Sequence, residues 1–272
     1  MDLDTVREVV VARDREDLAG LGPGTVVLAG GTWLYSEPQD GVERLVDITG
    51  LGWTPVAMDA GGLEIAATCT LAQLADSRYP ARWTGTALFG QACGALLASH
   101  KIRRTATVGG NVCLALPAGA VLAALTALGG YALVWGPRMD RWIPLSQFVF
   151  GPGNTRLNTG DMLRAIRIPE PNLRARTAFR KIALAPLGRS GAVVMGRRNL
   201  DGSCHLTLSA ATRRPVVLEF DEVPGGSELT ATIDAVNPRL WYDDPHGSPD
   251  WRHHVSTLLA AEVAAELAGG DA

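Results

Sequence analysis

The chain has 272 residues, of which 47% are hydrophobic and 19% charged, and its formal net charge is −3 at pH 7. This composition is typical of an ordered globular protein with a sizeable core, and it excludes an intrinsically disordered chain. The sequence has no dense basic stripe and no apolar run of membrane-spanning length, so we expect neither a nucleic-acid partner nor a membrane span. The first residues, Met1-Asp2-Leu3-Asp4, lack an apolar signal core, which predicts a cytoplasmic protein.

The first 50 residues alternate short β-branched runs with turns, and they predict a small αβ lobe. Strands are expected at 6–12, 25–29 and 44–48, with a short helix capped by Asp14. After the second strand, Gly30-Gly31-Thr32 is predicted to turn sharply, because paired glycines let a backbone turn and approach a ligand closely. The segment that follows, Trp33-Leu34-Tyr35, would either cover a ligand or pack into the core.

Residues 51–169 predict a second and larger αβ lobe. Its expected strands are 63–68, 131–135, 141–145 and 162–168, and its expected helices follow Thr70 or span 86–99 and 118–128. A second glycine turn, 105–111, follows Arg103 and Arg104, which would either neutralise an anion or face solvent. Backbone N–H groups in such turns form anion-binding nests. We therefore predict a diphosphate held between the two turns, with two ordinary turns as the alternative.

Pro169-Glu170-Pro171 predicts a linker to a third lobe. Strands are expected there at 177–184, 192–196, 205–210 and 216–220, followed by a short helix at 229–236. Ser248-Pro249 predicts the start of a last helix. Its apolar residues recur at helical spacing, so we expect that face to pack on the third sheet.

Several kinds of chemistry are missing from the sequence. A Gly-x-Gly-x-x-Gly unit between a strand and a helix, a phosphate-binding P-loop and a Gly-x-Ser-x-Gly elbow are all absent. Any nucleotide site must therefore be of another kind, which favours the two glycine turns. We identify no catalytic acid or base in the sequence. His253 and His254 are adjacent on the expected last helix, where successive side chains point about 100° apart, so no metal site is predicted.

The cysteines also carry information about cofactors. They are far apart and include no Cys-x-x-Cys pair: Cys69, Cys93, Cys113 and Cys204. Iron–sulfur ligation commonly uses closely spaced cysteines. We therefore expect no cluster in this chain, and buried neutral thiols instead.

The two glycine segments together are more specific than either alone. Gly-Gly-Thr after a strand, with Ala106-Thr107-Val108-Gly109-Gly110-Asn111 about 75 residues later, resembles the FAD-binding (medium) subunit of the xanthine dehydrogenase and carbon monoxide dehydrogenase family of molybdenum hydroxylases. The resemblance covers nearly the whole chain in the family's order. Later matching segments are Arg141-Trp142-Ile143-Pro144-Leu145, Phe148, Gly153, Thr155, Leu157, Asp161-Met162-Leu163, Ile166-Arg167-Ile168-Pro169, Phe179-Arg180-Lys181 and Trp251-Arg252.

The resemblance implies an α+β architecture. Two αβ lobes, 1–50 and 51–169, would form an FAD-binding fold of the vanillyl-alcohol oxidase type, and 170–272 would form a C-terminal αβ domain like that of the carbon monoxide dehydrogenase flavoprotein. FAD would lie extended between the lobes, with its flavin ring near Leu163 and Lys181. The implied contacts at the two turns are Leu28, Ala29, Gly30, Gly31, Thr32, Trp33, Leu34, Thr107, Gly109, Gly110 and Asn111.

The same resemblance implies an electron-transfer flavoprotein subunit of a multi-subunit oxidoreductase. Its partners would be a small subunit with 2Fe-2S clusters and a large subunit with the molybdenum cofactor, in a heterotrimer or a dimer of heterotrimers. Electrons would pass from the clusters to FAD and then to an external acceptor. The alternatives are a flavin-free structural subunit that bridges its partners and a free-standing flavin oxidase.

One position departs from the family's pattern. The family has Ser-Pro-x-x-Asp after the second turn, whereas this chain reads Leu116-Pro117-Ala118-Gly119-Ala120. Both the serine and the aspartate are missing. A charged hydrogen bond contributes roughly 1.5–3 kcal/mol, so we expect an aspartate restored at Ala120 to tighten FAD if the pocket keeps the family's shape.

Overall fold

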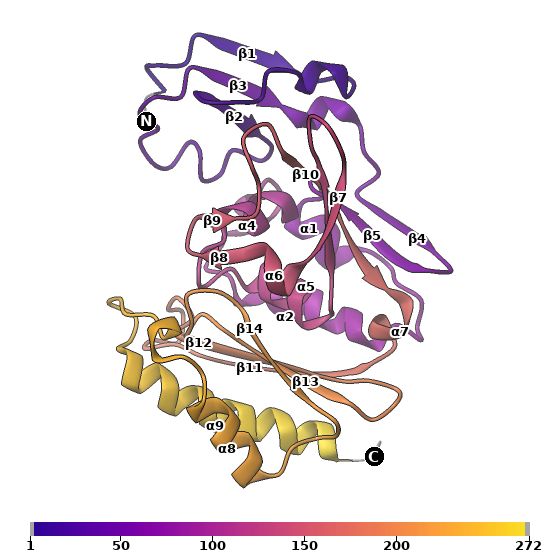
Figure 1. Cartoon of the computed structure of the whole chain (residues 1–272), viewed down its shortest axis with the longest axis vertical. Helices are drawn as coiled ribbons and strands as arrows, with labels where there is room; N and C mark the ends of the chain where they lie inside the picture. The colour runs from indigo at the N-terminus through magenta and orange to yellow at the C-terminus, as the bar shows by residue number, and fades with distance from the viewer. Residues whose placement is uncertain (1–2, 270–272) are drawn as a thin grey trace.

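The computed structural model describes residues 3–269 and arranges them in three layers, each built on its own sheet (Figure 1). The first sheet is parallel and has the order β1-β3-β2. Its strands are β1 (Glu8–Val11), β2 (Thr25–Leu28) and β3 (Arg44–Asp47). These are short β-branched runs, which suit a pleated and half-buried surface.

The second sheet is antiparallel, with the order β4-β5-β10-β6-β7. Its strands are β4 (Val56–Asp59), β5 (Gly62–Ala66), β6 (Tyr131–Trp135), β7 (Arg141–Pro144) and β10 (Met162–Pro169). The central strand β10 is apolar along most of its length and has most of its residues buried. The helices of this second layer are α1 (Leu71–Asp76), α2 (Ala87–Ala95), α4 (Val108–Leu114) and α5 (Ala120–Ala127).

The third sheet is an antiparallel meander of four strands in chain order. These strands are β11 (Arg176–Ile182), β12 (Ala192–Arg198), β13 (Cys204–Ser209) and β14 (Val216–Phe220). Helices α8 (Gly226–Asp234) and α9 (Pro249–Ala268) cover its outer face (Figure 1). Ser248 caps α9 as expected from the sequence, accepting a hydrogen bond from Trp251 N.

Helix α5 joins the second layer to the third. All of its residues are buried, and it contacts α2 and α4 on one side and β12 and β13 on the other. A helix that is apolar all round must be covered on every face. The alanine-rich segment therefore forms a central column rather than a surface helix.

The remaining elements are short. They are the 3₁₀ turns Glu16–Leu18, Ile48–Leu51, Thr84–Thr86 and Pro238–Leu240, the helices α3 (His100–Arg103), α6 (Leu145–Phe148) and α7 (Glu170–Leu173), and the strands β8 (Val149–Gly151) and β9 (Asn154–Thr155). The predicted linker Pro169-Glu170-Pro171 forms the start of the short helix α7. Glu170 accepts hydrogen bonds from Trp83 Nε1 (3.3 Å) and Arg82 Nε (3.2 Å), so the segment is a packed joint.

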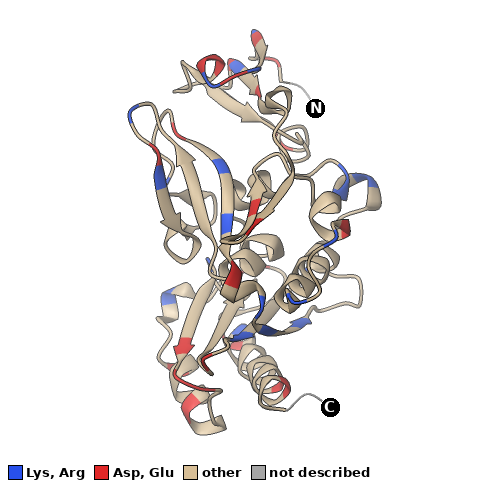
Figure 2. Cartoon of the chain, turned by 90° about the vertical axis from the view of Figure 1, so that its right-hand side faces the viewer, with Lys and Arg blue, Asp and Glu red and all other residues tan. Residues whose placement is uncertain are grey.

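Charges of both signs are interspersed over all three layers (Figure 2). Within residues 3–269, no helix has the length and apolar character needed to cross a membrane.

A buried arginine fastens α9 to the third sheet. Arg252 is 1% exposed. It donates from Nε to Gly247 O (2.9 Å), from Nη1 to the carbonyls of Gly191 (2.6 Å) and Ala210, and from Nη2 to Asp244 Oδ1. Every nitrogen of the guanidinium group is therefore paired, which is what makes the burial of its charge tolerable.

We expect Arg252→Met to destabilise the chain by about 3–5 kcal/mol, because it removes the guanidinium group from the largely buried Asp244 carboxylate and from three backbone carbonyls. Urea unfolding followed by circular dichroism would measure the change. Arg180→Met is the matched control, because Arg180 pairs with Glu262 and Glu266 at the surface, where such pairs are worth about 0–1 kcal/mol. Equal losses in the two variants would contradict the assignment.

Candidate functional site

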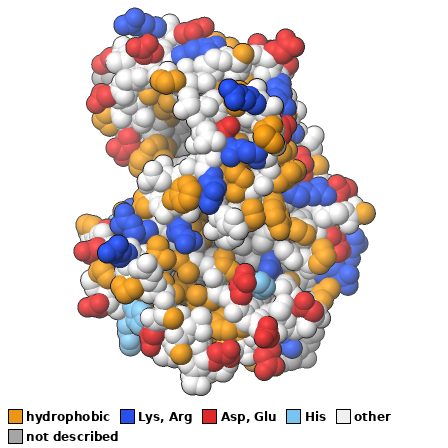
Figure 3. Space-filling view, in the orientation of Figure 1, with side chains coloured by type: hydrophobic (Ala, Val, Ile, Leu, Met, Phe, Trp, Pro, Cys, Tyr) orange, Lys and Arg blue, Asp and Glu red, His pale blue; other side chains and the backbone are white. Residues whose placement is uncertain are grey.

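A cavity of about 570 Å³ lies between the first layer and the second, a volume in the range of small-molecule sites. Its walls come from β2, the Gly-Gly-Thr turn, α4 and the start of β10. Figure 3 shows the surface hollowed between the upper lobe and the middle of the molecule. All of the predicted contact residues except Lys181 belong to this wall.

The two glycine segments touch at Gly30. A Cβ atom there would lie 2.0 Å from the carbonyl oxygen of Thr105, so only glycine permits the contact. Gly31 has φ +66°, a left-handed conformation that glycine adopts without strain. The first turn is therefore held directly against the segment that leads into α4.

The first turn presents a row of backbone N–H groups that have no protein acceptor. Among the described residues, none of the five N–H groups from Gly30 to Leu34 donates to a protein atom. The turn then closes through Tyr35 N to Gly31 O (2.9 Å) and Ser36 N to Trp33 O (2.8 Å). Backbone donors need partners. An anionic group in the cavity would supply several acceptors to this row at once.

The second glycine segment differs from the prediction, because it is the start of a helix rather than a nest. The N–H groups of the first four α4 residues are all taken. Val108 donates to Cys69 O (2.8 Å), Gly109 to Ala67 O (2.9 Å), Gly110 to Thr107 Oγ1 (3.0 Å) and Asn111 to Thr107 O (3.0 Å). The expectation that both turns offer a row of free amides is therefore wrong for the second one, where Thr107 N alone among residues 105–111 has no protein acceptor in the described chain.

What α4 contributes to the cavity is a flat wall. Gly110 is exposed, and a Cβ atom there would meet only Thr107 Oγ1, at 3.1 Å. Its Cα face is therefore open toward the cavity. Asn111 has a structural task as well, because its Oδ1 accepts from Leu122 N (3.0 Å) and caps α5. This bond compensates for Gly119, the N-cap residue of α5, which has no side chain.

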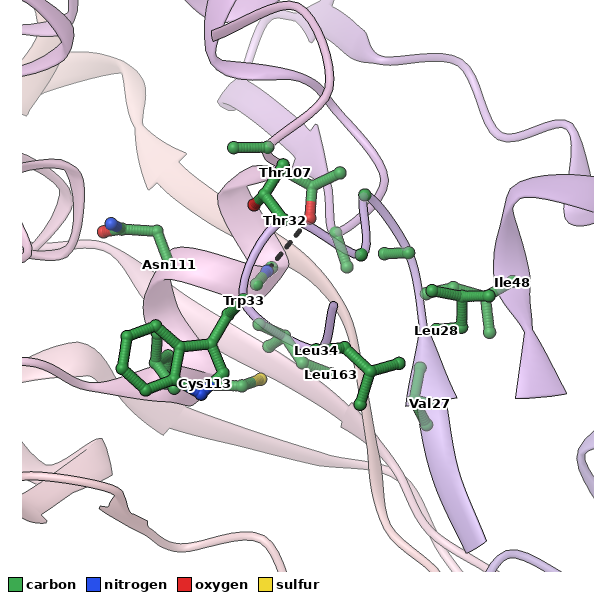
Figure 4. A pocket seen from close by; sticks show the side chains of 18 of the residues that line it. Val27, Leu28, Thr32, Trp33, Leu34, Ile48, Thr107, Asn111, Cys113 and Leu163 are labelled. Atoms are coloured by element: carbon green, nitrogen blue, oxygen red, sulfur yellow. Dashed lines mark hydrogen bonds between the residues drawn. The ribbon is translucent and has the colours of Figure 1, made fainter. Parts of the chain in front are cut away.

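The cavity has two apolar ends on either side of the turn (Figure 4). Val27, Leu28 and Ile48 lie at one end, and Trp33 and Cys113 lie at the other. Burial raises the pKa of Cys113 to about 12, so its thiol is neutral. Apolar surface at both ends with donors between them fits an extended ligand that has two rings joined by a charged link.

Asp161 is the single charged side chain among the described residues of the wall, and it is already paired. Its Oδ2 accepts from Arg141 Nη2 and from Asn158 N (2.7 Å). The described wall contains no lysine, arginine or histidine. The negative charge of a ligand would therefore be held by backbone amides, not by cationic side chains.

Three basic residues singled out in the sequence lie outside the wall. Arg103 ends α3 and Arg104 follows it, and neither lines the cavity. Lys181 is exposed on β11, in register with Val193. Val193 and Phe179 face the second layer. Lys181 is two residues after Phe179 on the same strand, so its side chain lies on the same face of the sheet. Its contact with a cofactor stays a prediction.

Sequence reasoning missed most of the apolar wall. The missed residues are Val26, Val27, Gln39, Ile48, Ala67, Leu71, Ile102, Ala106, Cys113, Leu114, Leu157, Asp161 and Met162. For Val26 and Val27 a signal existed, since they belong to the strand that feeds the turn. Ala106 lies in the second glycine segment, and Leu157, Asp161 and Met162 lie in segments that match the family, so these also had a signal. The remaining residues are placed by tertiary structure.

Comparison with known proteins gives a family match over most of the chain. Residues 5–171 match the family described as FAD binding domain in molybdopterin dehydrogenase. Two curated relatives are 26% identical over 190 residues: the putative xanthine dehydrogenase FAD-binding subunit XdhB of Escherichia coli (strain K12) and the xanthine dehydrogenase FAD-binding subunit of Escherichia coli O157:H7. The alignments cover 67% of this chain and 64% of each relative, just under two thirds of the relatives' length.

Solved structures are similar over almost the full length. A chain of reconstituted CO dehydrogenase from Oligotropha carboxidovorans superposes with a TM-score of 0.85 at 20% identity, covering 98% of this chain and 100% of that one. A chain of quinoline 2-oxidoreductase from Pseudomonas putida 86 gives 0.80 at 17% identity, with 98% of both chains covered. These likenesses confirm the predicted mixed α+β fold.

The structure changes the expectation for Ala120. The residue is 2% exposed at the start of α5 and does not belong to the cavity wall. A carboxylate there would be buried among apolar neighbours. We now expect Ala120→Asp to destabilise the chain by about 2 kcal/mol or more, because desolvation outweighs the 0.3–1 kcal/mol that a helix N-terminus typically returns.

Thermal unfolding of wild type and Ala120→Asp tests this revision, with Ala120→Ser as a control that adds a polar atom without charge. A melting temperature at or above that of wild type, together with tighter FAD, would restore the first expectation.

Proposed function

The chain belongs to the family of FAD-binding domains in molybdopterin dehydrogenases, and on this premise we propose that it is the FAD-binding electron-transfer subunit of a multi-subunit molybdenum hydroxylase. In the proposed complex it takes electrons from iron–sulfur clusters of a partner and delivers them to an external acceptor. The partners are a small iron–sulfur subunit and a large molybdenum-cofactor subunit, and the complex is cytoplasmic.

The observation that carries the proposal is the row of unpaired N–H groups from Gly30 to Leu34 between two apolar ends. FAD fits this arrangement, because its diphosphate needs donors and its two ring systems need apolar surface. The turn would hold the diphosphate, and the flat face at Gly110 would let it lie close to α4. Leu28, Ala29 and Thr32 border the same region of the wall, with Thr107, Gly109 and Asn111 opposite.

FAD supplies the redox chemistry when bound. The described residues of this chain bind it, orient it and exclude water, and none of the wall residues is placed as an acid or base. Leu163, at the start of β10, supplies apolar surface for a ring. Lys181 is proposed to approach the flavin from the third layer.

We also propose a division of the chain into three domains: FAD-binding lobe 1 at 1–50, FAD-binding lobe 2 at 51–169 and a C-terminal flavoprotein domain at 170–272. The division is supported by the three sheets, whose strands fall within 8–47, 56–169 and 176–220.

A second candidate function is a flavin-free subunit that only bridges its partners. The altered segment 116–120 favours it, since the carboxylate of the family's pattern is missing there. The intact glycine segments and the unpaired amides favour a bound cofactor.

Purification of the chain with its FAD content measured separates the two candidates. We expect about one noncovalent FAD per chain, seen as a flavin absorption spectrum and released on denaturation. A colourless chain that cannot be reconstituted with FAD would favour the structural subunit.

We expect Gly110→Val to weaken FAD by more than about a hundredfold, or about 2.7 kcal/mol, because its side chain would project into the cavity beside the diphosphate. The fold should persist, since valine and glycine differ little in a helix. Gly90→Val is the matched control, because Gly90 is also an exposed helical glycine but lies on α2, away from the cavity. Full FAD occupancy in Gly110→Val would mean that α4 does not face the cofactor.

A further inference from the structure

We propose that the indole of Trp33 stacks on a flat ring of the bound dinucleotide and closes the α4 end of the cavity. The inference rests on the proposed FAD site and deepens it, since it names the residue that recognises one of the two rings.

The three residues after the glycine turn, 33–35, differ in what their side chains contact. Leu34 is 9% exposed and packs with Leu28, Val42 and Leu45. Tyr35 is half-exposed and folds back over Gly31, where a Cβ atom would lie 2.4 Å from its ring. Trp33 lines the cavity while 43% of its surface stays exposed. Leu34 therefore packs in the core of the first layer as well as bordering the cavity, whereas Trp33 lines the cavity with much of its surface exposed.

The backbone around Trp33 is fixed. Its carbonyl oxygen accepts both Ser36 N (2.8 Å) and Ser36 Oγ (2.9 Å). The N–H group of Trp33 itself belongs to the unpaired row from Gly30 to Leu34. The indole is thus attached within the segment proposed to hold the diphosphate, so a ring joined to that diphosphate lies within its reach.

Figure 4 shows the indole extending from the turn on the opposite side from Val27 and Ile48, and both Trp33 and Cys113 line the cavity. Trp33 is the single aromatic side chain among the described residues of the wall. The same wall also contains the neutral thiol of Cys113 and the side chains of Leu157 and Leu163. A flat ring entering the cavity at Trp33 would have the indole as its aromatic contact, with aliphatic groups elsewhere on the wall.

Stacking on such a ring would remove a large apolar surface from water, in the offset geometry that aromatic pairs prefer. The exposed part of the indole then serves as the binding surface. The same contact predicts a spectroscopic signature, because an indole stacked on a flavin quenches the flavin's fluorescence.

The test is a titration of flavin-stripped chain with FAD in matched variants. We expect Trp33→Ala and Trp33→Leu to raise the FAD Kd by about tenfold or more, and Trp33→Phe to restore most of the loss. Trp142→Ala is the control, because Trp142 is 52% exposed on β7 and does not line the cavity. Trp33→Leu keeps apolar volume without an aromatic ring, so it separates stacking from simple packing.

Parallel titrations with FMN and with ADP identify the ring. A loss confined to FMN, with brighter flavin fluorescence in Trp33→Ala, assigns the isoalloxazine, and a loss confined to ADP assigns the adenine; either supports the stacking. Unchanged FAD affinity in both Trp33→Ala and Trp33→Leu, while wild type binds FAD, would overturn the stacking and leave the proposed function standing. A wild-type chain that binds no FAD would overturn both.

Discussion

The close approach of Gly30 to Thr105 is the contact on which the cavity depends. With only 2.0 Å between a hypothetical Cβ and the Thr105 carbonyl, the first turn is pressed against the segment before α4. Ala106 O, the next carbonyl along, accepts from Leu71 N at the start of α1 (2.9 Å), so the same segment is tied to the second layer. One glycine thus sets the distance between the two layers, and with it the width of the cavity between them.

Within the described chain, the N–H groups of the first glycine segment have no protein acceptors, whereas those of the second, except Thr107 N, are paired. The first segment leaves β2 and turns away from the sheet, so its N–H groups lose their ladder partners and gain none. The second runs beside residues 66–70, whose carbonyls take the N–H groups of Val108 and Gly109. Donors are therefore concentrated on one side of the cavity, and a flat apolar surface lies on the other. Such a wall would hold the charged middle of a ligand by hydrogen bonds. The two ends of the ligand would be held by shape complementarity and by ring stacking.

Much of the architecture could be predicted from the sequence, because β-branched runs and capping residues act locally. The strands of all three sheets except β4 were expected, whereas the separate pair β8–β9 was not. Ser248 and Thr70 cap the helices they were expected to begin. The strand β4 was missed because its exposed residues carry little apolar alternation. The filled amides of α4 were not predictable either, since their acceptors at Ala67 and Cys69 are supplied by another part of the chain. For the same reason Pro169-Glu170-Pro171 predicted a linker, whereas Trp83 and Arg82 hold it in place.

The chemistry of the wall limits what the chain can do by itself. General acid–base catalysis needs a titratable side chain free to exchange a proton with a ligand. Asp161 is committed to Arg141 and Asn158, and burial keeps the Cys113 thiol neutral. Among the described wall residues the groups that remain are amides, hydroxyls and apolar surface. Such a wall is suited to binding and orienting the proposed cofactor. An electron carrier needs no substrate pocket of its own, so this wall supports the proposed electron-transfer role over that of a free-standing oxidase.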